Sequence, residues 1–139
     1  MSQITILLAD NDTMICQCIR RVVEEDPQLQ VRWEAHDGLQ TLVLAQRHHP
    51  DILLVDSQMP RMDGIEVTRC LRMKKYPIRI LVMGALEQKR ELALAAGADE
   101  YITKDSGCDS IYKMLHQLAQ LVELTVTGRD EAPSFTEKV

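Results

Sequence analysis

The sequence predicts an α/β fold in which a parallel five-stranded sheet is covered by helices on both faces. Short apolar runs alternate five times with segments whose apolar residues recur at helical spacing. Several of these runs are apolar almost throughout, as strands are when both of their faces are buried. Strands separated by helices run parallel through right-handed crossovers, and the helices then pack on both faces of the sheet.

The first strand is expected over residues 4–9, a run that is apolar but for one threonine. Asp12 or Thr13 can cap the following helix, because short polar side chains accept hydrogen bonds from its first free N–H groups. Asp26 and Pro27 end this helix, since the residue before a proline disfavours helical backbone. Apolar residues spaced by three or four positions are expected to form its inward face: Ile15, Cys18, Ile19, Val22 and Val23.

Two further strands and a helix follow in the first half of the chain. Residues 29–35 alternate between apolar and polar side chains, which indicates a half-covered strand at a sheet edge. Asp37 and Gly38 break the chain, and residues 39–48 then show helical spacing. Residues 52–56, "ILLVD", form the next fully apolar strand, which ends in an aspartate.

The second half repeats the pattern. A loop, "SQMPRMDG", leads to a helix over about residues 65–74, and "IRILVM", residues 78–83, is another buried strand. Residues 87–96 are expected to be helical, and Gly97 suits the left-handed position after a helix end. A short strand follows over residues 100–103. The last helix carries a long apolar stripe: Ile111, Met114, Leu115, Leu118, Leu121 and Val122.

Composition limits the classes of function. A chain of 139 residues with 45% apolar and 27% charged residues is typical of one globular domain, expected over residues 1–124. The polar stretch 125–139 is expected to be a linker or disordered tail, which in a longer protein would lead to an output domain. A net charge of −5 argues against direct nucleic-acid binding. No apolar stretch approaches the roughly 20 residues of a membrane span, and no signal peptide is evident, so a cytoplasmic protein is expected.

The cysteines are expected to be reduced. Cys16, Cys18, Cys70 and Cys108 form no C-x-x-C pair, and Cys16 and Cys18 would point in different directions on a helix. We therefore expect partly buried thiols rather than disulfide, metal or redox sites.

Polar residues follow several of the predicted strands at their carboxyl ends, where parallel sheets bind ligands. They are Asp10, Asn11, Asp12, Asp56 and Lys104, and Gly84 stands at the matching position after another strand. Neighbouring carboxylates repel one another unless a cation joins them, and Mg²⁺ is a hard cation that prefers oxygen ligands and often bridges to phosphate. Carboxylates, Mg²⁺ and a lysine together favour phosphoryl transfer, with an aspartate as acceptor of the phosphoryl group.

The chain resembles the receiver domains of two-component response regulators. The resemblance covers about residues 3–122, and its strongest stretch is "PDILLVDSQMPRMDGIEV". The acids after the first strand and "GADEYITK" support it. It implies a CheY-like, flavodoxin-like (βα)5 three-layer sandwich with strand order 2-1-3-4-5.

The same resemblance implies roles for individual residues. Asp56 would be the phosphoacceptor, and Asp10 the first member of the acidic pair that holds Mg²⁺. Asn11 stands at the second position of that pair, and the backbone carbonyl of Gln58 would be a further metal ligand. Lys104 would contact the phosphoryl group.

Two positions depart from the family pattern. Asn11 can offer Mg²⁺ a neutral oxygen where the family has a carboxylate, and whether Asp12 compensates is left open. Gly84 stands where the family has a threonine or serine whose hydroxyl binds the phosphoryl group, which leaves only backbone contacts there. Tyr101 matches the aromatic residue that changes rotamer on activation. We therefore expect an atypical receiver with weakened metal binding and weakened switching between positions 84 and 101.

The resemblance also implies partners. A histidine kinase or phosphotransfer protein would supply the phosphoryl group, and a homodimer is left open. Lys104 followed by Asp105 is common in the branch with a C-terminal LuxR-type DNA-binding domain, which favours a transcriptional output.

Two alternatives remain from the sequence. The chain would be a pseudo-receiver, a docking or dimerisation module independent of phosphorylation, if its pocket no longer functions. A more remote alternative is a phosphatase of the haloacid-dehalogenase type, with Asp10 as nucleophile and Asp12 as acid. The residue at position 14 is methionine rather than the threonine or valine of that motif, and "SQMPRMDG" stays unexplained.

Overall fold

The five strands form one parallel sheet. The computed structural model describes residues 3–130, with side chains through residue 123. The strand order is β2-β1-β3-β4-β5, and every neighbouring pair is parallel, which confirms the predicted flavodoxin-like α/β fold. The strands are β1 (Ile4–Ala9), β2 (Leu29–Ala35), β3 (Ile52–Asp56), β4 (Arg79–Gly84) and β5 (Glu100–Thr103).

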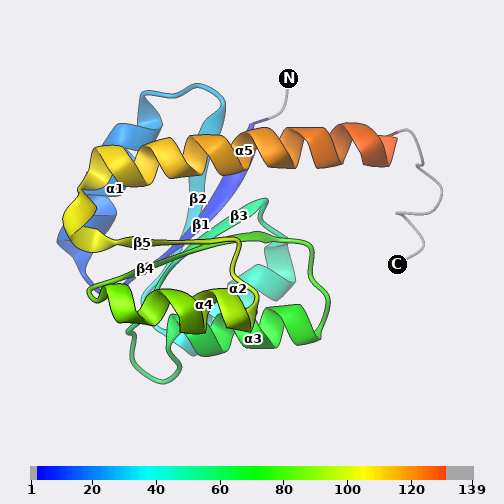
Figure 1. Cartoon of the computed structure of the whole chain (residues 1–139). Coiled ribbons are helices and arrows are strands. Elements are labelled where there is room, and N and C mark those ends of the chain that lie inside the picture. The colour runs from blue at the N-terminus through cyan, green and yellow to red at the C-terminus, as the bar shows by residue number, and fades with distance from the viewer. Residues whose placement is uncertain (1–2, 131–139) are drawn as a thin grey trace.

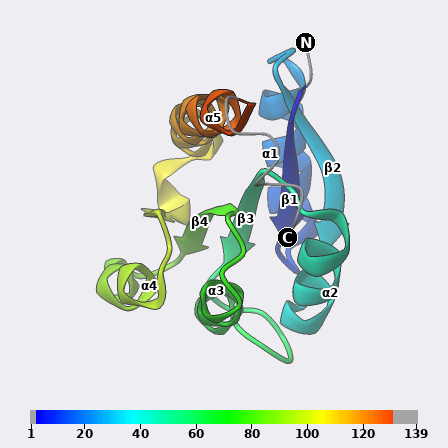
Figure 2. The ribbon, with the colours of Figure 1, turned by 90° about the vertical axis from the view of Figure 1, so that its right-hand side faces the viewer.

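Helices cover both faces of the sheet, as Figures 1 and 2 show. On one face lie α1 (Thr13–Glu24) and α5 (Cys108–Asp130). On the other lie α2 (Gly38–His48), α3 (Gly64–Met73) and α4 (Arg90–Ala96). Short 3-10 helices over Glu87–Lys89 and Lys104–Ser106 lead into α4 and α5.

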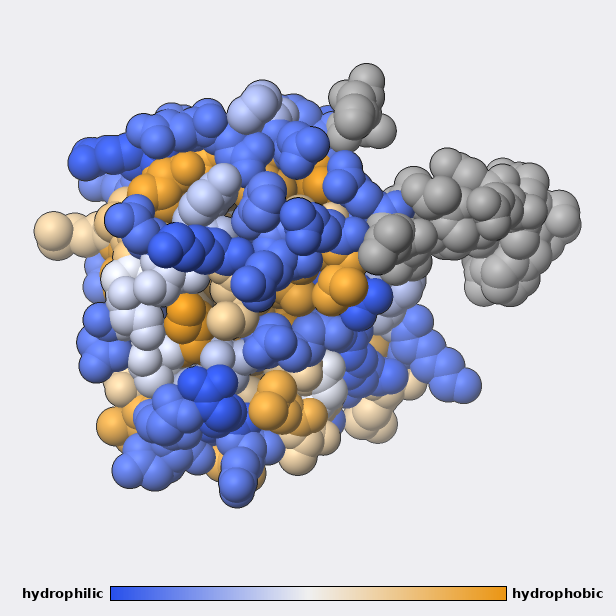
Figure 3. Space-filling view, turned by 45° about the horizontal axis from the view of Figure 1, so that its top comes forward, coloured by the Kyte–Doolittle hydropathy of each residue, from blue (hydrophilic) through white to orange (hydrophobic). Residues whose placement is uncertain are grey.

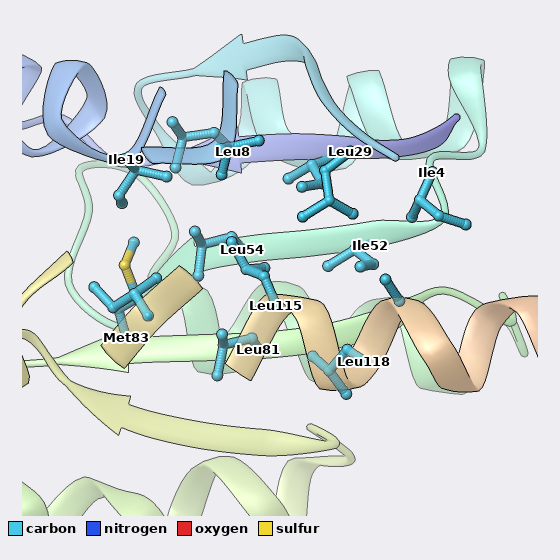
Figure 4. Close-up of a cluster of buried hydrophobic side chains, with 14 of the residues drawn as sticks. Ile4, Leu8, Ile19, Leu29, Ile52, Leu54, Leu81, Met83, Leu115 and Leu118 are labelled. Atoms are coloured by element: carbon cyan, nitrogen blue, oxygen red, sulfur yellow. The ribbon is translucent and has the colours of Figure 1, made fainter. Parts of the chain in front are cut away.

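The sheet separates two apolar cores because successive strand side chains point to opposite faces. Figure 4 shows the core under α1 and α5, where Leu8, Leu54 and Leu81 of adjacent strands meet Ile19 and Leu115. The opposite core contains Leu7, Leu53 and Val82 and lies under α2, α3 and α4. Since both faces of β1, β3 and β4 are buried, their sequences are apolar except for Thr5 and for Asp56 and Arg79 at strand ends.

Aspartates begin three of the helices. Asp12 caps α1 by accepting from the N–H groups of Met14 and Ile15. Asp37 caps α2 in the same way. Asp63 caps α3 in a reciprocal capping box with Glu66. The loops at the carboxyl ends of β1, β2 and β3 therefore lead into well-defined helix starts.

The inward face of α1 differs from the prediction at one position. Cys16 is buried there, whereas Cys18 is exposed. The predicted spacing started from Ile15, which is only partly buried, and a helix that starts at Thr13 is rotated so that Cys16, Ile19 and Val23 face the sheet.

Two cysteines also correct the prediction of four reduced thiols. Cys18 on α1 and Cys108 at the start of α5 are joined in a disulfide, 90 residues apart in sequence. The pairing follows from the packing of α1 beside α5, which sequence spacing does not reveal. Cys16 and Cys70 are free thiols, as predicted. Burial, with the nearby carboxylates of Glu34 and Asp10, raises the pKa of Cys16 to about 12, which keeps it protonated.

The last helix is longer than the sequence indicates. α5 continues to Asp130, so residues 125–130 of the predicted linker or disordered tail are helical, while the domain end at residue 124 stays a prediction. Residues 131–139 of the predicted tail lie outside the described residues. Leu121, predicted in the apolar stripe of α5, is 43% exposed, and Ala119 is buried in the core instead.

The surface seen in Figure 3 is mainly hydrophilic, with apolar patches between the polar side chains. Among the described residues, the exposed large apolar side chains include Leu86, Leu92 and Leu94, in and just before α4. No helix within residues 3–130 is long and apolar enough to cross a membrane.

Candidate functional site

Three charged side chains from the carboxyl ends of three strands meet in one pocket. Asp10 follows β1, Asp56 ends β3, and Lys104 follows β5. The Lys104 Nζ atom lies 2.9 Å from Asp10 Oδ2 and 3.0 Å from Asp56 Oδ2. The two carboxylates are almost completely buried, with exposed fractions of 0% and 4%. The convergence predicted from the strand ends is therefore present.

Asp10 is fixed through its own loop and through β2. Its Oδ1 atom accepts a hydrogen bond from the Asp12 N–H at 2.8 Å. Its backbone carbonyl is 3.0 Å from His36 Nδ1 and accepts from the Cys16 thiol at 3.6 Å. The Oδ2 atom is buried and faces the Lys104 ammonium at 2.9 Å, which compensates its charge.

Asp56 and Lys104 depend on one another. The Asp56 Oδ1 atom accepts from the Gln58 N–H at 3.0 Å, and Oδ2 accepts from Lys104. Burial raises the pKa of Asp56, although Gln58 and Lys104 oppose that shift. Burial acts to lower the pKa of Lys104, but hydrogen bonds and charge from both carboxylates raise it. A second cation would relieve the crowding of the two acids.

The donor set fits a hard cation such as Mg²⁺. The Asp10 Oδ2 atom is a buried carboxylate oxygen that faces the Lys104 ammonium, and carboxylate oxygens are ligand atoms of the type that Mg²⁺ prefers. Asp56 and the carbonyl of Gln58 are close in the chain and can complete a set of oxygen ligands.

Asn11 and Asp12 differ in what they can add to this pocket. Asn11 is exposed and brings no charge. Asp12 uses its side chain to cap α1, where Oδ1 accepts from Met14 at 3.0 Å. The structure therefore gives Asp12 a structural task at the start of α1. Whether Asp12 also compensates for the missing carboxylate at position 11 stays open.

The loop after Asp56 is held close by glycines. A Cβ atom at Gly64 would lie 2.2 Å from the Asp56 carbonyl oxygen, and one at Gly38 would lie 1.9 Å from the Met62 carbonyl oxygen. The Gly64 N–H also donates to the Ser57 carbonyl at 3.3 Å. The "MDG" of the sequence thus combines a close backbone approach at Gly64 with the helix cap at Asp63.

Gly84 and Tyr101 fit together beside the pocket. Tyr101 is 1% exposed, and its hydroxyl donates to the Leu86 carbonyl at 2.5 Å. A Cβ atom at position 84 would lie only 2.0 Å from that hydroxyl. Glycine at position 84 therefore provides the space that the tyrosine occupies.

Arg90 holds Tyr101 from the other side. Its guanidinium lies 5.3 Å from the centre of the tyrosine ring and donates to the Tyr101 carbonyl at 2.8 Å. Arg90 also pairs with Glu87. Sequence reasoning did not identify Arg90, because no sequence signal connects α4 with β5.

Sequence reasoning also missed Ser57, although it directly follows the predicted phosphoacceptor. Ser57 is 7% exposed, and its hydroxyl lies 2.9 Å from the place of a Cβ atom at Gly84. The sequence showed only that Ser57 is next to Asp56. The structure adds that the close approach of β3 to β4 places its hydroxyl beside Gly84.

Residues 6–116 match the response regulator receiver domain family. The matched segment covers most of the 139 residues, and the chain therefore belongs to this family. The fold, with its five parallel strands and five α-helices, agrees with that membership.

The similar proteins include a response regulator and an enzyme. The chain is 36% identical over 117 residues to the nitrate/nitrite response regulator protein NarL of Escherichia coli, covering 83% of this chain and 54% of NarL. It is 34% identical over 113 residues to a protein-glutamate methylesterase/protein-glutamine glutaminase of Pyrococcus abyssi, covering 78% of this chain and 30% of that protein. The chain thus spans about half or less of the length of these relatives.

Solved structures of response regulator domains have a fold similar to that of this chain. The receiver domain of a putative response regulator NarL from Mycobacterium tuberculosis superimposes with a TM-score of 0.81 at 29% identity. That match covers 86% of this chain and 98% of the other. The response regulator domain of Thermotoga maritima CheB gives a TM-score of 0.75 at 26% identity, covering 87% of this chain and 97% of that domain.

Proposed function

We propose that this domain accepts a phosphoryl group on Asp56 from a histidine kinase or phosphotransfer protein. The observation that carries the proposal is the contact of Lys104 with the buried carboxylates of Asp10 and Asp56 at 2.9 and 3.0 Å. In the transfer, the bond between phosphorus and the donor atom breaks, and its electron pair stays on the donor. A new bond forms between phosphorus and a carboxylate oxygen of Asp56.

Lys104 and the metal ligands have distinct tasks in this reaction. Lys104 provides a positive charge that can move from the Asp56 carboxylate to a phosphoryl oxygen. Asp10, Asp56 and the Gln58 carbonyl would hold Mg²⁺. Mg²⁺ bound there neutralises the charge of the phosphoryl oxygens during transfer. Asn11 contributes no charge, so Mg²⁺ is expected to bind more weakly than to a site with a third carboxylate.

Tyr101 favours a second candidate function, that of a docking module that does not depend on phosphorylation. The resemblance to receivers makes this residue the aromatic group that changes position on activation. Here it is buried against Gly84, and its hydroxyl donates to the Leu86 carbonyl. Phosphorylation then has little further movement to induce, and the surface around α4 would be available to a partner in either state.

The output of the whole protein is proposed to be transcriptional. The similarity to NarL and the Lys-Asp pair at positions 104 and 105 support a DNA-binding domain elsewhere in the full protein. The net charge of −5 supports a regulatory domain that does not itself contact DNA. The similarity to a methylesterase favours an enzymatic output domain as the other option.

The phosphoacceptor is tested by incubating the chain with acetyl phosphate and Mg²⁺ and measuring its intact mass. We expect one phosphoryl group on the wild-type chain and none on Asp56→Asn. Asp109→Asn, which changes an exposed aspartate at the start of α5, serves as the control and should be phosphorylated like wild type. An unmodified wild-type chain, or equal modification of Asp56→Asn, would refute this function and favour the docking module.

A further inference from the structure

We propose that Ser57 supplies the phosphoryl-binding hydroxyl that position 84 lacks. This inference rests on the proposed function, because it requires a phosphoryl group on Asp56. Ser57, which follows the acceptor Asp56, would make the hydrogen bond to the phosphoryl group that glycine at position 84 cannot make.

The first step is geometric. A side chain at position 84 would begin at a Cβ atom, and that point lies 2.9 Å from Ser57 Oγ and 2.0 Å from the Tyr101 hydroxyl. Two hydroxyl groups from other strands therefore border the space that a threonine side chain would fill. Tyr101 occupies the volume that a side chain at position 84 would fill, and the Ser57 hydroxyl lies beside that volume.

The second step concerns which of these hydroxyls is available. The Tyr101 hydroxyl already donates to the Leu86 carbonyl at 2.5 Å. Thr103 and Ser106, which flank Lys104, bond to each other at 3.0 Å. The Ser57 hydroxyl takes part in none of the hydrogen bonds among the described residues. Of the two hydroxyls that border position 84, Ser57 is thus the one with an unused donor.

The third step is that Ser57 is held in place. Its N–H donates to the Met83 carbonyl at 2.6 Å, and its carbonyl accepts from Gly64 at 3.3 Å. The Ser57 N–H is therefore tied to β4 and its carbonyl to the start of α3, which fixes the residue beside Asp56. A hydroxyl without a protein partner on this 7% exposed residue is free to donate to a ligand. A phosphoryl oxygen on the preceding residue is a ligand of the right chemistry.

A hydrogen bond to a charged group is strong enough that its loss changes the affinity for an anionic ligand by a measurable factor. Its removal is expected to weaken binding of an anionic phosphoryl analogue by about tenfold or more. The same removal should not destabilise the unliganded domain, because Ser57→Ala deletes a hydroxyl that has no partner in the fold. A residue with a merely structural role would show the opposite pattern, with a loss of stability and unchanged affinity.

The test uses the full chain and beryllofluoride with Mg²⁺, titrated by ¹⁹F NMR, together with thermal unfolding without ligand. The variants are Ser57→Ala and, as a matched control on α5, Ser110→Ala. We expect Ser57→Ala to bind beryllofluoride about tenfold or more weakly and to unfold at the wild-type temperature or above it. Ser110→Ala should bind like wild type.

The outcomes separate this inference from the proposed function. If wild type and Ser57→Ala bind beryllofluoride equally well, the role of Ser57 is refuted while phosphoacceptance by Asp56 stands. If wild type itself binds no beryllofluoride and takes no phosphoryl group from acetyl phosphate, the proposed function fails and the role of Ser57 fails with it.

Discussion

The pocket has two halves that differ in the functional groups they contain. The charged half, made by Asp10, Asp56 and Lys104, keeps buried carboxylates in contact with a lysine. The switch half, made by Gly84 and Tyr101, has no side chain at position 84, and the tyrosine fills that space. Under the proposed function, phosphoryl binding and its conversion into movement would depend on separate parts of the pocket.

The physical reason lies in what each half needs. The charged half requires residues of opposite charge at the carboxyl ends of the strands. A parallel sheet brings these ends together at one edge, whichever residues lie around them. The switch half requires two discrete arrangements of similar free energy. A tyrosine that is buried, hydrogen-bonded to Leu86 and covered by Arg90 favours one arrangement strongly.

The largest effect is expected from Lys104→Met in the charged half. The change leaves two buried carboxylates without their cation, and loss of one partner of a buried ion pair costs about 3 kcal/mol. Urea unfolding should show this loss without metal, and Mg²⁺ should restore part of it by taking the place of the lysine. Lys113→Met, at an exposed lysine of α5, is the control. Equal stability of the two variants would mean that the acids are not held by charge.

The next effect is expected from Gly84→Ala in the switch half. The added methyl group would overlap the Tyr101 hydroxyl and force the ring from its site, at about 2 kcal/mol. Gly84→Ala combined with Tyr101→Ala should cost less than the sum of the two single changes, because the smaller side chain removes the overlap. Additive losses in a double-mutant cycle would show that Gly84 and Tyr101 are not coupled.

A smaller effect is expected from Asn11→Asp, which restores a charged ligand to the charged half. Mg²⁺ affinity measured by isothermal titration calorimetry should increase about tenfold, or about 1.4 kcal/mol, because another carboxylate joins the site. Asn11→Ala removes the neutral oxygen and should bind Mg²⁺ no better than wild type. No change in Asn11→Asp would place residue 11 outside the metal site.

The smallest effect concerns a contact outside both halves. Burial acts to raise the pKa of Asp26, but the Gln28 N–H, the Tyr112 hydroxyl and His116 together lower it. A lowered pKa in the folded state stabilises the protein at pH values above the ordinary pKa of about 3.9, and that contribution is lost as the pH falls below it.

Asp26→Asn should therefore lower the unfolding free energy by about 1 kcal/mol near neutral pH. The difference from wild type should shrink below about pH 4, where the wild-type carboxylate gains its proton. Chemical unfolding across this pH range measures it, and Mg²⁺ binding should stay unchanged. A difference that grows toward low pH would have the wrong sign for this account.

The sequence predicted the charged half well because its signals are local. Apolar runs ended at Asp10 and Asp56, and parallel strands bring their carboxyl ends to one edge. The strand order came from the resemblance to receivers, whereas Lys104 was expected at this edge from its place after the last strand, and both agree with the structure. The roles of these residues in catalysis remain predictions.

The features that the sequence did not reveal depend on tertiary contacts. The position of Tyr101 and the unused hydroxyl of Ser57 follow from how closely β3, β4 and β5 approach. The disulfide of Cys18 and Cys108 depends on the packing of α1 beside α5. None of these contacts has a periodic pattern or a motif.

The central claim is that this domain can bind a phosphoryl group while its switch is already set. The most direct measurement is an NMR comparison of the chain with and without beryllofluoride and Mg²⁺. The account predicts large shifts for the amides of Asp56, Ser57 and Lys104, and small shifts for the Tyr101 ring and the Leu86 amide. Large shifts around Tyr101 and Leu86 on binding would contradict it.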